Sequence, residues 1–161
     1  MAAASVRTAA SVALLVTGYY LAPLEGRPDT VAWPWFGLAL ALLGVVVVRQ
    51  IVAVARSGRP RLRAMEALGV IVPLLLVVFA ATYTLISGAD PDAFTEPVGR
   101  TDALYFTMTV FATVGFGDIA AVAEPARIVV TIQMIVGLIL VGVVAKVIVG
   151  AVDVATRRHP T

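Results

Sequence analysis

Four apolar stretches, each long enough to cross a bilayer as a helix, constrain the fold of this chain more than any other feature. One crossing needs about 20 apolar residues, and the segments that reach this length are residues 6–24, 33–55, 64–87 and 126–154. Of the 161 residues, 60% are hydrophobic and only 14% are charged, which is too little charge to cover the surface of a soluble domain. The sequence therefore predicts an all-α membrane protein with four transmembrane helices.

A polar segment of 38 residues separates the third and fourth stretches, but its centre is apolar. Residues 103–112 are rich in aromatic and aliphatic side chains, yet they are too few to cross the bilayer. Asp102 lies just ahead of them and is placed to cap the N-terminus of a helix. We therefore expect a re-entrant helix between the third and fourth spans.

Basic and acidic residues separate to opposite sides of the predicted membrane. The loop between the second and third stretches carries four arginines within eight residues: Arg56, Arg59, Arg61 and Arg63. Eight acidic residues fall on the other side. The positive-inside rule then places this loop and both termini in the cytoplasm of a multi-pass plasma-membrane protein. The re-entrant segment then enters from outside, and the outer mouth around it is acidic, which would concentrate cations there. The arginines are topology determinants, and they are also candidate contacts for anionic lipid headgroups.

The N-terminal stretch permits two readings. Arg7 followed by an apolar run resembles a signal peptide, but no small-x-small cleavage site precedes Pro23, which favours a retained span. The second stretch begins with an aromatic cluster, Trp33, Trp35 and Phe36, typical of a membrane interface, and Pro34 suits its first helical turn. A voltage sensor needs positive charges at every third position of a span, and none of the stretches has that pattern.

The motif Thr113-Val114-Gly115-Phe116-Gly117 follows directly on the re-entrant segment. Removing water from a cation requires oxygen ligands on every side, and neutral carbonyls bind it without trapping it. Successive carbonyls point the same way only if the backbone alternates between ordinary and left-handed conformations, which glycine adopts without steric cost. A simple surface turn is the alternative, but the complete motif after a re-entrant helix favours an ion path.

Thr113 to Asp118 resemble the signature filter of the potassium-channel superfamily, in its phenylalanine variant. Outer helix, pore helix, filter and inner helix resemble the two-helix pore module over residues 64–154. The resemblance implies a homotetramer that binds K⁺ at Thr113, Val114, Gly115 and Phe116, with Gly117 completing the filter. It also implies filter support from Tyr105, Phe106, Thr109 and Asp118, and a gating hinge at Gly137, for which close helix packing is the alternative role.

Two departures from the family pattern concern the filter. Phe116 replaces the commoner tyrosine, so it has no hydroxyl to bond to the surrounding aromatic side chains. Thr109 stands where some bacterial members have a buried glutamate, so no Glu–Asp118 contact is expected. Lys146, deep in the fourth stretch, is expected to reach the cytoplasmic interface or to pair with Asp153 or Glu66.

The leading hypothesis is a potassium-selective channel subunit, with residues 1–63 as two accessory helices and 64–161 as the pore module. A non-selective cation channel of the same fold is one alternative, and a membrane enzyme or non-conducting accessory protein is another. The chain has no cysteine and only one histidine, His159, so the spans hold no catalytic or metal-binding cluster and no cofactor is expected. A net charge of +2 is too small to indicate nucleic acid.

Overall fold

The computed structural model describes residues 2–22, 29–58 and 60–157 and shows an all-α fold over them. Five α-helices and one short 3-10 helix follow in order: α1 (Ala2–Leu21), α2 (Asp29–Ala55), α3 (Pro60–Ala89), η1 (Pro91–Ala93), α4 (Arg100–Phe111) and α5 (Glu124–Arg157). Within these ranges the only β pairing is an isolated bridge between Phe94 and Ala121. The predicted all-α class is confirmed.

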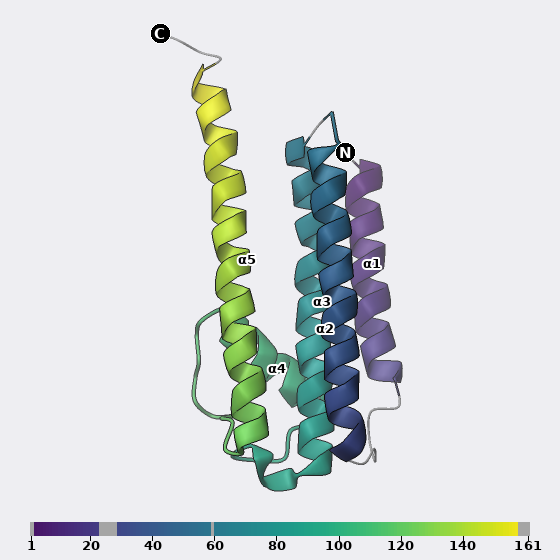
Figure 1. The fold of residues 1–161 in the computed structure, drawn as a ribbon, viewed down its shortest axis with the longest axis vertical. Helices are drawn as coiled ribbons and strands as arrows, with labels where there is room; N and C mark the ends of the chain where they lie inside the picture. Colours follow the sequence, from purple (N-terminus) through teal and green to yellow (C-terminus); the bar gives the residue numbers. More distant parts are fainter. Residues whose placement is uncertain (1, 23–28, 59, 158–161) are drawn as a thin grey trace.

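Helix α3 occupies the centre of the subunit. It packs against α1, α2, α4 and α5, and most of its C-terminal half, from Leu75 to Ser87, is buried. Phe79 and Tyr83 of α3 have no exposed surface and form an aromatic cluster with Phe36, Phe94 and Phe106. Figure 1 shows α5 diverging from α2 and α3 toward its C-terminal end, while the short α4 lies between α3 and α5 near the other end.

Three helices contain stretches that are long and apolar enough to cross a membrane. These stretches are Pro34–Val54, Arg63–Ala89 and Glu124–Lys146, which overlap the second, third and fourth predicted spans. In α1 the searched part, Ala9–Leu21, is apolar but shorter. The first predicted span therefore forms a helix, and its crossing of the membrane stays a prediction.

The start of α1, the α2–α3 connection and the end of α5 lie at one end of the molecule (Figure 1). The link from α3 through η1 and the start of α5 lie at the other end. This arrangement agrees with the charge pattern of the sequence, which predicts the termini and the arginine loop on one side of the membrane.

Two local predictions were wrong in detail. Pro34 is inside α2 and past its first turn, because the helix already begins at Asp29. Phe36 is buried and packs edge-to-face on Phe79, with ring centroids 5.8 Å apart, and the interfacial position of the aromatic cluster stays a prediction. Asp102 is not ahead of the re-entrant helix but in its first turn, where its carboxylate accepts a hydrogen bond from the Gly99 N–H at 3.2 Å.

Candidate functional site

The chain turns sharply at the end of α4 and anchors residues 113–117, the predicted filter, to the helix that precedes them. The carbonyl of Thr109 accepts hydrogen bonds from the N–H groups of Val114 at 2.9 Å and Gly115 at 3.3 Å. The N–H of Thr113 donates to the carbonyl of Val110 at 3.1 Å. These bonds satisfy carbonyls that a helix C-terminus otherwise leaves unpaired. The end of α4 thereby fixes where the filter begins.

The filter backbone alternates between ordinary and left-handed conformations. Positive φ angles occur at every second residue: 57° at Thr113, 54° at Gly115 and 82° at Gly117. Glycine adopts such angles freely, whereas a β-branched residue does so only under constraint. Sequence reasoning identified the two glycines and missed Thr113, because threonine carries no signal for a left-handed backbone. Such strain at a non-glycine residue is characteristic of functional sites.

Tyr105 and Phe116 connect α4 to the outer end of the filter. The Tyr105 hydroxyl donates a hydrogen bond of 2.7 Å to Oδ2 of Asp118. The rings of Tyr105 and Phe116 are stacked, with an interplanar angle of 2° and centroids 6.3 Å apart. Thus α4 contacts Asp118 through Tyr105, although Thr109 cannot make such a contact. The sequence feature that indicates this contact is the tyrosine of the Tyr105–Phe106 pair, because only its hydroxyl can donate to a carboxylate.

The Tyr105–Asp118 hydrogen bond shifts the pKa of both groups. It is the main cause of a lowered pKa for the Asp118 carboxyl and of a raised pKa for the Tyr105 hydroxyl. A hydrogen bond to the ionised carboxylate favours that form over the neutral acid. The bond therefore stabilises the outer mouth fully above about pH 4, the ordinary range of an aspartate, and is lost as the pH falls through the lowered pKa.

We expect Tyr105→Phe to raise the pKa of Asp118, so that acid reduces cation flux at a higher external pH than in the wild type. The measurement is flux through liposomes as a function of external pH. Asp118→Asn is the control, because it removes the titrating group and should abolish this acid step. An identical midpoint for the wild type and Tyr105→Phe would contradict the assignment.

The segment before α4 is hydrogen-bonded to the segment that follows the predicted filter. The Thr95 hydroxyl donates to the carbonyl of Asp118 at 3.2 Å and accepts from the N–H of Ala120 at 3.0 Å. The backbone adds the bridge between Phe94 and Ala121, and Arg127 Nε donates to the carbonyl of Ala121 at 3.2 Å. These contacts hold the outer end of the filter against the subunit.

A buried polar network joins the three helices around the filter. The Tyr83 hydroxyl of α3 donates to Gln133 Oε1 of α5 at 2.6 Å, and Gln133 Nε2 donates to the carbonyl of Thr107 in α4 at 2.9 Å. All three residues are almost completely buried. Sequence reasoning missed this network, although a glutamine in the apolar middle of α5 was a usable signal, because a polar side chain there needs a partner.

The filter lies on the surface of the single subunit. Residues 112–118 are all exposed, including Val114 at 53% and Phe116 at 70% of their surface. In α5, Met134, Leu138 and Val141 are apolar and also exposed. One subunit therefore leaves large apolar side chains uncovered both in this segment and on α5.

Gly137 is buried where α5 passes the end of α4. A Cβ atom placed there would lie 3.6 Å from Cδ2 of Phe111, an ordinary contact distance. A methyl group would therefore be accommodated there, so the packing of α5 on Phe111 does not require glycine. Lys146 is exposed, and the side chain of Asp153, its predicted partner, lies outside the described residues. Glu66, the other predicted partner, forms an ion pair with Arg63 at 3.2 Å.

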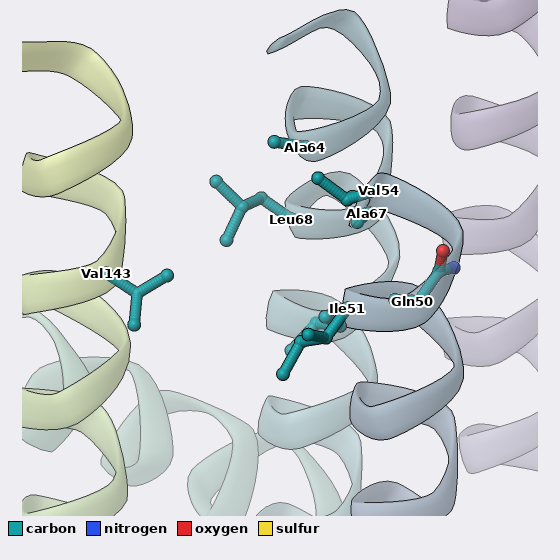
Figure 2. A pocket seen from close by; sticks show the side chains of 8 residues that line it. Gln50, Ile51, Val54, Ala64, Ala67, Leu68 and Val143 are labelled. Carbon is teal, nitrogen blue, oxygen red and sulfur yellow. The ribbon is translucent and has the colours of Figure 1, made fainter. Parts of the chain in front are cut away.

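An apolar cavity of about 270 Å³ separates α5 from α2 and α3 near the α2–α3 connection. Figure 2 shows Leu68 of α3 and Val143 of α5 pointing toward each other across it. Ile51, Val54 and Ala67 complete much of its wall. The helices are thus in loose contact at this end, whereas the buried network joins them at the other.

Long apolar helices around a re-entrant helix and an exposed, alternating backbone segment define a membrane pore protein. A family model described as an ion channel matches residues 71–153, just over half of the chain, and the match includes α4 and the filter. The chain therefore belongs to this ion channel family, a family of membrane transport proteins. The comparisons with curated proteins and with solved structures find no match.

Proposed function

We propose that four copies of this chain form a potassium-selective pore, with Thr113 to Gly117 of each copy as the filter. The alternation of left-handed φ angles at Thr113, Gly115 and Gly117 is the observation that carries the proposal. Alternation of this kind turns successive carbonyls toward the same side of the strand. Four such strands around an axis present stacked rings of neutral oxygens, which replace the hydration shell of K⁺ and still release it.

The ion positions in this proposal are rings formed by Thr113, Val114, Gly115 and Phe116. Asp118 and the other acidic residues of the mouth raise the local cation concentration. Residues 64–161 form the pore module and residues 1–63 the accessory helices. Both termini and the arginine loop face the cytoplasm of a plasma membrane, in accordance with the positive-inside rule.

The homotetramer is supported by what one subunit leaves uncovered. Val114 and Phe116 are exposed large apolar side chains, and Met134, Leu138 and Val141 of α5 are exposed and apolar as well. Symmetric association covers both surfaces at once and closes the path. Non-helical backbone at membrane depth is tolerated only where it lines such a pathway.

The gate is assigned to the cytoplasmic half of α5. Gly137 lies one turn beyond Gln133, whose side chain bonds to the carbonyl of Thr107 in α4, so it is placed to act as a hinge. Beyond it the apolar cavity leaves α5 room to move (Figure 2). The α2–α3 connection lies at the same end of the molecule (Figure 1). The arginines in and beside it in the sequence are the proposed contacts for anionic lipid headgroups: Arg56, Arg59, Arg61 and Arg63.

Reversal potentials in mixed potassium and sodium test selectivity. For the purified protein in planar bilayers, we expect a reversal potential close to the equilibrium potential of K⁺, because the rings match the coordination of K⁺. Equal permeability to Na⁺ would support the non-selective channel of the same fold. A protein that stays monomeric and gives no flux would instead support the accessory role.

A further inference from the structure

The guanidinium of Arg100, the first residue of α4, holds the C-terminal end of α1. Its Nη1 donates hydrogen bonds of 2.8 Å to the carbonyls of both Tyr19 and Tyr20, and its Nη2 donates one of 2.6 Å to the carbonyl of Ala22. The last carbonyls of any helix have no partner within the helix, and they carry the negative end of its dipole. One arginine therefore satisfies three acceptors and complements their charge.

Tyr19 makes the contact reciprocal. Its side chain is 3% exposed, and its hydroxyl donates a hydrogen bond of 2.7 Å to the carbonyl of Arg100. The same hydroxyl lies 3.1 Å from Oγ1 of Thr84 in α3. The end of α1 is thus bonded to the start of α4 in both directions and to α3 as well.

A generic arginine at a membrane interface would not produce this geometry. Salt bridges and headgroup contacts at a surface contribute little and leave the side chain mobile. Here two guanidinium nitrogens reach three carbonyls of one helix turn, which uses the planar fork of arginine and not only its charge. The acceptors are backbone carbonyls, so the contact does not depend on a partner side chain that another residue could replace.

The position of this contact links it to the filter. Helix α4 is 12 residues long, so at about 1.5 Å per residue it is a short rod of about 18 Å. Its first turn is fixed by Arg100 and by the Gly99–Asp102 hydrogen bond, and its last turn holds Val114 and Gly115 through the carbonyl of Thr109. A tilt at one end of a stiff helix displaces the other end.

We propose that α1 is a working part of the pore, and that Arg100 is a positioning residue through which the end of α1 sets the orientation of α4 and hence of the filter. This inference rests on the proposed selective pore. It assigns a role to the first helix that packing around the pore alone would not give, because a merely packed helix could move without altering selectivity.

The test combines two measurements on the full-length chain. Since the chain has no cysteine, Leu21→Cys, at a position 78% exposed, carries a spin label that reports the mobility of the end of α1. The sodium-to-potassium permeability ratio reports the filter. Both are measured for the wild type, Arg100→Gln, Arg100→Lys and Arg49→Gln, the last being a matched loss of an exposed arginine in α2.

We expect Arg100→Gln to increase the mobility of the spin label and to raise the sodium-to-potassium permeability ratio about fivefold. Arg100→Lys should behave like Arg100→Gln, because one ammonium cannot reproduce the fork. Arg49→Gln should leave both measurements unchanged. If Arg100→Gln does not assemble, Tyr19→Phe removes the hydroxyl contacts only and should shift both measurements in the same direction by less.

Two results would overturn the inference. A loosened label with an unchanged permeability ratio would show that α1 is anchored but does not act on the filter. Full recovery of both measurements by lysine would show that the positive charge matters and the fork does not. A wild type that does not discriminate K⁺ from Na⁺ would refute the proposed function instead, while the label would still report whether Arg100 holds α1.

Discussion

Replacing Gly115 with alanine is expected to reduce potassium flux through liposomes to the level of protein-free vesicles. The reason is the backbone and not a clash, because a Cβ at Gly115 would meet nothing within 4 Å in the subunit while φ is 54°. A left-handed conformation costs an L-residue about 1–2 kcal/mol. Four copies around one axis therefore disfavour the conducting backbone by about 4–8 kcal/mol per tetramer.

Gly142→Ala is the matched control for this variant. Gly142 lies in α5, has a helical backbone, and a methyl group added there would also meet nothing within 4 Å. We expect it to conduct normally and to unfold at the same or a slightly higher temperature, because alanine favours a helix over glycine. Normal conduction by Gly115→Ala would show that the filter lies elsewhere in the chain.

Among the variants considered, replacement of the buried Gln133 should lower the stability of the folded protein most. Gln133→Leu leaves the Tyr83 hydroxyl without a partner in the protein interior and removes a bond to the carbonyl of Thr107. A buried polar group left unpaired costs about 1–3 kcal/mol. We expect a clearly lower midpoint in thermal unfolding of the purified protein, because the network joins α3, α4 and α5.

A double variant separates the orphaned hydroxyl from lost packing. In Tyr83→Phe/Gln133→Leu no hydroxyl remains unpaired, so its destabilisation should be smaller than the sum of the two single changes. Thr131→Val serves as the control, since the hydroxyl of Thr131 is exposed and bonds only within its own helix, at 2.8 Å to the carbonyl of Arg127. Strict additivity of the two single effects would argue against a shared network.

The sequence predicted what depends on chain composition and missed what depends on tertiary geometry. Hydropathy located three long apolar helices because the length of a crossing is set by the bilayer, and the family match agrees with the pore-loop motif. The left-handed angle at Thr113, by contrast, is imposed by the turn onto Thr109 and has no signature in the residue type.

The contacts of polar side chains were the least predictable part. Arg100 and Tyr19 are 81 residues apart, and neither residue indicates the other. The sequence grouped Phe36 with its neighbouring tryptophans and did not indicate Phe79 of α3 as the ring on which it packs. The Tyr105–Asp118 bond lies between these cases, because the motif placed both residues near the filter and only their hydrogen bond was missing.

The exposure of the filter on a single subunit has a genetic consequence. If each copy provides one quarter of the proposed ring, a defective copy damages the three normal copies assembled with it. In a cell that makes equal amounts of normal and Gly115→Ala chains, random assembly leaves only about one tetramer in sixteen without a defective copy. Damage to the filter should therefore behave as a dominant trait, whereas a chain that fails to fold and never assembles should behave as a recessive one.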